Sequence, residues 1–176
     1  MPLENFLRGT MYFFDLPMSV IRPGPAHQEP LAFDYLGQNY LLAPALCYEI
    51  AYAWLVREMA AESNMLITLS NDAWFGTSIG PSQHMQIAQA RALENQKPLL
   101  RVTNNGITAL VDHQGLILER APQFKSTAIS TAIEPRTGGT PYTRHGSLFA
   151  TFLAGLMLLY AIFRSLRNRW FQAHII

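Results

Sequence analysis

The residue best suited to chemistry is Cys47, the single cysteine of this 176-residue chain. It follows an apolar run of strand length, residues 40–46, and precedes a segment, 49–62, whose composition is typical of a helix. A side chain at such a junction is exposed, and the free amide groups of the first helical turn stabilise a thiolate beside them. The thiolate could attack a carbonyl carbon while the same amides stabilise the oxyanion. An inert, packed cysteine is the alternative, and the carboxylate of Glu49, two residues away, favours the catalytic interpretation.

The remaining polar residues give weaker signals. The five histidines, at positions 27, 84, 113, 145 and 174, include no pair at ligand spacing, so we expect no bound metal. We expect His84, near the start of a helical segment, to be a structural hydrogen-bonding residue rather than a base. Arg91 and Glu94 are three residues apart and are expected to form an ion pair on one helix. The sequence contains no Gly-rich phosphate loop or dinucleotide fingerprint.

The composition excludes several classes of protein. Hydrophobic residues make up 49% of the chain and charged residues only 14%, which argues against disorder and indicates contact with a membrane. The net charge of +1, with no basic stripe, argues against a nucleic-acid partner. A single cysteine excludes an intramolecular disulfide and a zinc site built from several thiolates.

Strand-like and helix-like segments alternate, which predicts an α/β layered domain with a mixed sheet. We expect the first 35 residues, with prolines at positions 2, 17, 23, 25 and 30, to be rich in loops. Asn104-Asn105-Gly106 is expected to form a hairpin turn, because Asn-Gly tolerates positive φ angles. The expected strands span residues 40–46, 65–70, 99–103, 107–111, 116–119 and 126–133, and the expected helices span residues 49–62 and 82–96.

The last quarter of the chain is a candidate membrane anchor. Residues 146–163 carry no charge, and about 20 mostly apolar residues are enough to span a bilayer. A buried core helix is the alternative, although such a helix usually has a polar stripe. Arg164, Arg167, Arg169 and Trp170 follow at once, which predicts a cytoplasmic tail, 164–176. The preceding domain, 1–143, would then lie outside the membrane, in the periplasm of a Gram-negative cell. The N-terminus does not have the pattern of a signal peptide.

Several sequence blocks, taken together and in order, resemble one family. They occur over nearly the whole chain, and the set is specific although any single block would be weak. The family is that of the apolipoprotein N-acyltransferases, a membrane branch of the nitrilase (carbon-nitrogen hydrolase) superfamily. The blocks are Cys47-Tyr48-Glu49, Leu69-Ser70-Asn71-Asp72-Ala73-Trp74-Phe75-Gly76, Gly80-Pro81-Ser82-Gln83-His84, Arg91-Ala92-Leu93-Glu94, Arg101-Val102-Thr103-Asn104-Asn105-Gly106-Ile107-Thr108 and Gly138-Gly139-Thr140-Pro141-Tyr142.

The resemblance implies the C-terminal portion of a nitrilase-like α-β-β-α sandwich facing the periplasm, followed by one transmembrane helix in the bacterial inner membrane. It implies a ping-pong transfer of a fatty acyl chain from a phospholipid, typically phosphatidylethanolamine, to the free amine of a lipoprotein's S-diacylglyceryl-cysteine. Cys47 aligns with the nucleophile that carries the acyl group as a thioester, and Tyr48 and Glu49 align with residues that support the pocket and the catalytic geometry. No metal or organic cofactor is implied, because the thioester supplies the activation.

Polar and aromatic residues after the strand at 65–70 are the candidate substrate-binding residues. Asn71 and Asp72 are expected either to form a pocket wall or to serve as turn residues, because loops at strand ends of α/β proteins usually line the site. Trp74 and Phe75 are expected either to cap the core or to contact an acyl chain.

The chain departs from the family's pattern in one respect. The nitrilase-type triad is Glu-Lys-Cys, and its glutamate and lysine precede the cysteine by a long interval. Here the only lysines, Lys97 and Lys125, both follow Cys47. We therefore interpret the chain as the C-terminal part of a full-length enzyme, a truncated or split product whose partner would be the missing N-terminal half. Half a sandwich leaves a sheet edge and one sheet face uncovered, and the isolated chain is expected to lack useful activity.

Two other functions stay open at the level of the sequence. A membrane-anchored amidase or nitrilase-type hydrolase would also form a thioester on Cys47, but it would pass the acyl group to water instead of an amine. A non-catalytic remnant would bind a partner or do nothing.

Overall fold

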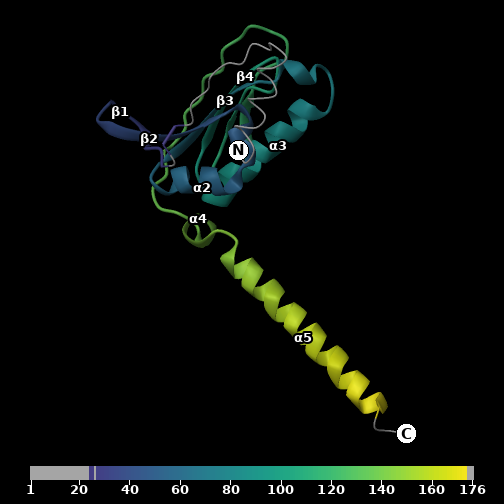
Figure 1. Cartoon of the computed structure of the whole chain (residues 1–176). Helices are drawn as coiled ribbons and strands as arrows, with labels where there is room; N and C mark the ends of the chain where they lie inside the picture. Colours follow the sequence, from purple (N-terminus) through teal and green to yellow (C-terminus); the bar gives the residue numbers. More distant parts are fainter. Residues whose placement is uncertain (1–23, 26, 174–176) are drawn as a thin grey trace, which may run out of the picture.

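The computed structural model describes residues 24–25 and 27–173, and it shows a sheet covered by helices, with a long helix leading away from it (Figure 1). Two short 3₁₀ helices, η1 and η2, follow two of the strands. The elements are β1 (Leu31–Tyr35), β2 (Gln38–Leu46), η1 (Cys47–Ala51), α2 (Ala53–Ala61), β3 (Met65–Asn71), η2 (Ala73–Phe75), α3 (Gly80–Asn95), β4 (Leu99–Asn104), β5 (Ala109–Val111), β6 (Ile117–Arg120), α4 (Pro141–His145) and α5 (Leu148–Ala173).

The six strands form one mixed sheet in the order β1-β2-β3-β4-β5-β6. The three central strands, β2, β3 and β4, are parallel, while β1, β5 and β6 pair antiparallel with their neighbours. Because α2 and α3 provide the crossovers between the parallel strands, the carboxyl ends of these three strands meet at one edge of the sheet. The residues that follow β2, β3 and β4 are therefore brought together there, and we call this the site edge.

The core lies between the sheet and the two crossover helices. Leu66 on β3 pairs in register with Leu99 on β4, and Leu99 pairs with Val111 on β5, so their side chains lie on one face of the sheet. All three are fully buried, together with Val56 of α2 and Ala88 of α3. The predicted α/β layered fold with a mixed sheet is thus confirmed.

The opposite face of the sheet is also apolar but exposed. Leu46, Leu69 and Val102 pair across β2, β3 and β4, and each is between 45% and 59% exposed. Phe33 and Tyr35 of β1 are exposed as well. A large, contiguous apolar surface of this kind is typical of a face that packs against another layer, as the sequence predicts for one half of a sandwich.

A short helix, α4, joins the domain to α5. The Thr140 hydroxyl donates to the carbonyl of Glu94 at 2.6 Å, and the Thr143 hydroxyl donates to the Asn95 side chain at 3.1 Å, both at the C-terminal end of α3. From α2, the Arg57 guanidinium donates to the Thr143 carbonyl at 3.1 Å. These bonds fix the chain at the end of α3 that lies away from the site edge.

A buried lysine holds the segment just before α4. Lys97 is 1% exposed, and its Nζ donates to the carbonyls of Arg136 and Gly138 at 2.9 and 2.7 Å. Burial lowers the pKa of Lys97, because desolvation disfavours its charged form. Both contacts are to backbone oxygens, so this lysine has a structural role.

Helix α5 leads away from the domain (Figure 1). Its first 18 residues, Leu148–Ser165, are long and apolar enough to cross a membrane, and none of that window is buried. The alternative of a buried core helix is therefore wrong. The helix differs from the expected span, 146–163, at both ends: it begins at Leu148, after Gly146 has ended α4, and it continues past the arginines.

Three expectations about local structure are corrected. The helix expected at 49–62 is divided into η1 and α2 at Tyr52, and residues 126–133, expected as a strand, form no regular element, because no neighbouring strand in the described part of the chain pairs with them. Residues 31–35, expected within a loop-rich region, form β1. Positive φ angles at Leu36 and Gly37 turn the chain so that β1 pairs with β2. Residues 1–23 lie outside the described residues.

Candidate active site

Cys47 lies at the site edge, where β2 ends and η1 begins. Its side chain is exposed, and its φ angle of 52° is in the left-handed region. A residue other than glycine rarely adopts this conformation, and such strain concentrates at functional positions of a fold. The sharp turn presents the thiol beyond the last rung of the sheet, as the strand–helix junction predicts.

Glu49 and Tyr48 flank this turn in different ways. The Glu49 carboxylate accepts a hydrogen bond of 2.7 Å from the backbone N–H of Leu46, the residue just before Cys47. This hydrogen bond therefore stabilises the turn that contains Cys47. Tyr48 is exposed, and its ring packs edge-on against Tyr52 with centroids 5.7 Å apart. Glu49 thus has a direct structural link to the position of Cys47, while Tyr48 contributes an aromatic surface beside it.

A buried ion pair lies next to the thiol. Asp72 follows β3 and Arg101 lies on β4, and their side chains are 1% and 0% exposed. Arg101 Nη2 donates to Asp72 Oδ2 at 2.8 Å. Burial lowers the pKa of Arg101, and the negative charges of Asp72 and of a Cys47 thiolate oppose this shift. The positive charge of Arg101 therefore acts on both Asp72 and Cys47.

The other carboxylate oxygen of Asp72 has two further partners. His84 of α3, itself buried, has its Nδ1 3.0 Å from Asp72 Oδ1, and a hydrogen bond to a carboxylate places the proton on that nitrogen. The Ser70 hydroxyl donates to the same oxygen at 2.5 Å, a length typical of a hydrogen bond to an ionised carboxylate. The Asp72 carboxylate thus has three side-chain partners, Arg101, His84 and Ser70.

Ser70 connects this buried centre to the exposed thiol. Its Oγ lies 3.6 Å from Cys47 Sγ, within hydrogen-bonding distance for sulfur. The hydroxyl has one proton, so it can donate either to Asp72 or to Cys47, but not to both at once. The chain Cys47, Ser70, Asp72, Arg101 is therefore continuous from the surface to the core.

The other predicted substrate-binding residues divide into two kinds. Asn71 makes the contacts of a turn residue, since its Oδ1 accepts from the backbone of Ala73 at 3.2 Å and from Asn104 Nδ2 at 3.4 Å. Trp74 is 91% exposed, which excludes the alternative that it caps the core. Phe75 is exposed on one side and packs edge-on against His84, with ring centroids 6.4 Å apart.

Ser70 and Arg101 are residues for which the sequence analysis proposed no individual role, although both lie in the blocks that carry the resemblance. His84 makes a buried hydrogen bond to Asp72, as expected of a structural residue, and its exclusion as a base stays a prediction. Arg91 and Glu94 form the expected ion pair, 3.1 Å apart, on the partly buried side of α3. A signal for Arg101 existed in the sequence, because a charge two residues after Leu99 occupies a core-facing position of a buried strand.

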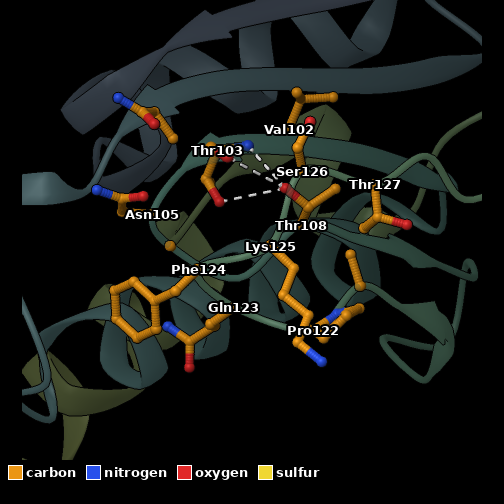
Figure 2. A pocket seen from close by; sticks show the side chains of 13 residues that line it. Val102, Thr103, Asn105, Thr108, Pro122, Gln123, Phe124, Lys125, Ser126 and Thr127 are labelled. Atoms are coloured by element: carbon orange, nitrogen blue, oxygen red, sulfur yellow. Dashed lines mark hydrogen bonds between the residues drawn. The ribbon is translucent and has the colours of Figure 1, made fainter.

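A cavity of about 370 Å³ opens at the same edge, beside the turn after β4 (Figure 2). It lies between the Asn104-Asn105-Gly106 turn and the segment 121–127, and Figure 2 shows the hydroxyls of Thr103 and Thr108 bonded to each other in it. Its walls are mostly polar and uncharged, and Lys125 is the cation among them. Cys47 is not part of its lining. Within the residues that the structure describes, no group of three or more His, Cys, Asp or Glu side chains is placed to hold a metal ion.

The fold and the site together define an α/β domain with a strained, exposed cysteine at a strand–helix junction. The family model for carbon-nitrogen hydrolases matches residues 7–142, so the chain belongs to the carbon-nitrogen hydrolase family. A solved carbon-nitrogen hydrolase from Helicobacter pylori has the same fold, with a TM-score of 0.51 and 18% identity over 58% of this chain and 42% of that one.

More similar relatives are known from sequence. An apolipoprotein N-acyltransferase of Pseudomonas aeruginosa is 45% identical over 161 residues, which is 92% of this chain and 31% of the relative. One of Photobacterium profundum is 50% identical over 147 residues, or 83% of this chain and 28% of the relative. The chain therefore spans about a third of the length of the curated relatives it matches.

Proposed function

We propose that this chain is the nucleophile-bearing part of an apolipoprotein N-acyltransferase and that Cys47 carries the acyl group. The observation that carries the proposal is the placement of the only cysteine, exposed and in a left-handed turn at the carboxyl end of a parallel strand. Identity of 43–50% to relatives of that name supports the same activity for this chain.

The proposed reaction has two steps that balance. The Cys47 thiol gives up its proton to a base and attacks, as the thiolate, the ester carbonyl of a phospholipid of the phosphatidylethanolamine type. The carbon–oxygen bond breaks, and the alkoxide of the lysophospholipid takes up that proton as it leaves. The free amine of a lipoprotein's S-diacylglyceryl-cysteine then attacks the thioester. The carbon–sulfur bond breaks, an amide forms, and the amine's proton restores the thiol. The thioester itself supplies the activation in this scheme.

We place α5 across the bacterial inner membrane and the domain, 1–143, on its periplasmic side. Eighteen apolar residues rise roughly 27 Å as a helix, close to the ~30 Å of the hydrocarbon core. Arg164 and Arg167 follow this stretch directly, which favours a cytoplasmic C-terminus, 164–176. The exposed, apolar surface of α5 supports this placement, because such a surface in water would be costly.

The proposal includes a second layer on the exposed face of the sheet. Leu46 and Leu69, on that face, directly precede the thiol and Ser70, so whatever covers them also borders the site. Lys97 is not placed to act as the lysine of the family's triad, because it is buried and its Nζ bonds to two backbone carbonyls. We therefore expect acyl transfer only when further polypeptide, such as the segment that precedes the matched region in the relatives, covers this face.

The test combines the chain, in phosphatidylethanolamine vesicles, with the preceding segment of the Pseudomonas aeruginosa relative produced as a separate polypeptide. We expect the intact mass of the chain to increase by one fatty acyl group, an increase that hydroxylamine reverses and that Cys47→Ala abolishes. The chain without the added segment should show no adduct. Formation of mature, triacylated lipoprotein by the chain alone, in cells depleted of the native enzyme, would contradict the requirement for that segment.

A hydrolase is the second candidate, and the match to the carbon-nitrogen hydrolase family favours it specifically. With a diacylglyceryl peptide added to the same vesicles as acceptor, an enzyme of that kind would release free fatty acid and lysophospholipid and leave the peptide amine unmodified. If neither adduct nor released product formed under any combination, the non-catalytic alternative would stand instead.

A further inference from the structure

We propose that Ser70 is a positioning residue for Cys47. The Ser70 hydroxyl changes its hydrogen-bond partner as the thiol ionises, and the buried centre formed by Asp72, Arg101 and His84 makes this change possible. The inference rests on the proposed role of Cys47 as nucleophile, and it goes further by assigning a function to a buried polar cluster that the acyl-transfer scheme does not use.

The geometry gives Ser70 two alternative partners. With a protonated thiol, the Ser70 hydroxyl donates to Asp72 Oδ1 at 2.5 Å, and its oxygen can accept the S–H of Cys47 across 3.6 Å. With a thiolate, the same hydroxyl can turn and donate to Sγ, which then has only lone pairs to offer. A rotation about one side-chain bond is sufficient, and no backbone movement is required.

The rotation is feasible because Asp72 keeps its other partners. When Ser70 turns away, Arg101 still donates to Oδ2 at 2.8 Å and His84 Nδ1 to Oδ1 at 3.0 Å. Gly106 packs directly against the carboxylate, since a Cβ there would lie 2.7 Å from Cβ of Asp72. That contact closes one side of the pair to water, which strengthens its electrostatic interactions.

The charged groups around Cys47 make a hydrogen-bond donor important for stabilising its thiolate. On its own turn Cys47 has Glu49, a carboxylate whose side chain is engaged by a backbone N–H. Asp72 is a second carboxylate nearby, Arg101 is the buried arginine paired with it, and His84 contributes an N–H to Asp72. On α2, the charges of Arg57 and Glu58 pair with each other, and Arg57 bonds to α4 at the opposite end of the domain. Two carboxylates, those of Glu49 and Asp72, thus lie close to the thiol, and a hydroxyl proton directed at Sγ offsets their repulsion of a thiolate.

The thiol can be tested without substrate, because the chain has one cysteine. The full chain in detergent micelles would be alkylated with iodoacetamide between pH 6 and 10, and the rate constant measured from the intact mass. Only the thiolate reacts. A hydrogen bond to a charged group affects its stability by an amount that corresponds to a change of about tenfold or more in the fraction of that charged form. We therefore expect Ser70→Ala to lower the alkylation rate near pH 7 about tenfold, with rates that converge on those of the parent chain at the top of the pH range.

Two further variants separate the hydroxyl from the shape of the side chain. Ser70→Thr and Ser70→Val have the same branched outline, which strands accommodate well, but only threonine keeps the hydroxyl. Ser70→Thr should react at close to the parent rate and Ser70→Val should behave like Ser70→Ala, so the pair gives an answer even if the alanine variant fails to fold. Ser82→Ala, an exposed serine on α3, is the matched control and should leave the rate unchanged.

Two results would overturn the inference: equal alkylation of the threonine and valine variants at every pH, or a loss of rate that persists unchanged at high pH, which indicates a purely structural effect. Neither readout involves phospholipid or acyl transfer. A chain that forms no acyl adduct even with the added segment, but shows the expected alkylation profile, would refute the proposed function and leave the inference about Ser70 intact. The reverse pattern would refute the inference and leave the proposed function intact.

Discussion

The ion pair between Arg101 and Asp72 leads to a sharp prediction about stability. Both side chains are essentially inaccessible to solvent, and their nearest atoms are 2.8 Å apart. Arg101→Met keeps an extended side chain but removes the arginine's charge, which leaves the buried Asp72 carboxylate with the hydrogen bonds from His84 and Ser70. Removing one partner of a buried pair typically costs about 3–5 kcal/mol. Since ~1.4 kcal/mol corresponds to a factor of ten, the ratio of unfolded to folded chain should rise by at least about 100-fold.

The structure also predicts that adding Asp72→Asn to Arg101→Met recovers part of the lost free energy of unfolding. Arg101 Nε and Nη1 are buried without hydrogen-bond partners. Burying this ion pair therefore costs considerable desolvation free energy. Asp72→Asn preserves the shape next to Gly106 but cannot be ionised. The double variant, Arg101→Met with Asp72→Asn, should therefore be more stable than Arg101→Met alone, a non-additivity in the favourable direction.

The assay is urea unfolding of the full chain in mild detergent, followed by far-ultraviolet circular dichroism, with α5 held in the micelle. Arg120→Met is the matched control, because Arg120 is exposed at the end of β6, and its free energy of unfolding should change by less than about 0.5 kcal/mol. A loss below about 1 kcal/mol for Arg101→Met, or a double variant less stable than either single one, would refute the reasoning that an uncompensated buried charge dominates the effect.

Two other substitutions test the packing and the titration of the domain. Gly106→Ala places a Cβ against the Asp72 side chain, so we expect overpacking to cost about 1–3 kcal/mol in the same urea assay, and a stability equal to that of the parent chain would contradict the contact. Burial raises the pKa of Glu94 above 4.5, with Arg91 opposing the shift. The folded chain therefore holds this proton more firmly than the unfolded chain, and stability should fall as the pH rises from below 4.5 through the raised pKa. Glu94→Gln should remove that slope between pH 4 and 7, and an identical slope in both proteins would show that another group is responsible.

The parallel part of the fold could be predicted from the sequence because its signals are local. Each of the central strands contains a short apolar run, and a helical segment follows β2 and β3 within a short distance, so the order and type of these elements could be predicted without knowledge of their contacts. Residues 126–133 have the composition of a strand, but strand formation requires a partner with free backbone groups. The reverse applies to β1, whose partner β2 follows across a tight turn at Leu36 and Gly37. Pairing, and not composition, decided both cases.

Single residues of the candidate site, Cys47 above all, were predictable, but the network that joins them was not. Cys47 stands out because it is unique and lies at a junction between two recognisable elements. The buried centre beneath it joins Ser70, Asp72, His84 and Arg101, of which Asp72 and Arg101 are 29 residues apart in the sequence. Their meeting depends on the register in which β3 and β4 pair, with Ser70 opposite Thr103 and Thr68 opposite Arg101. Register is set by packing across the whole sheet, so a local pattern could not reveal that these four residues form one network.

The positions of the thiol and of the membrane helix place a constraint on any reaction with lipid. Helix α3 links the two: His84 near its first turn contacts Asp72 at the site edge, whereas Glu94 and Asn95 at its last turn hold α4, from which α5 begins. Ten residues of helix separate these contacts, a rise of roughly 15 Å. If α5 crosses the bilayer as we propose, it does so from the end of α3 that lies away from Cys47, so α5 alone is not expected to bring the thiol to the lipid surface. Under the proposed function, we expect the lipid ester to be guided by groups at the site edge, where Trp74 and Tyr48 are exposed, or by the polypeptide that covers the apolar face of the sheet. We therefore predict that this second layer would do more than supply a general base: it would also complete the path from the bilayer to the thiol.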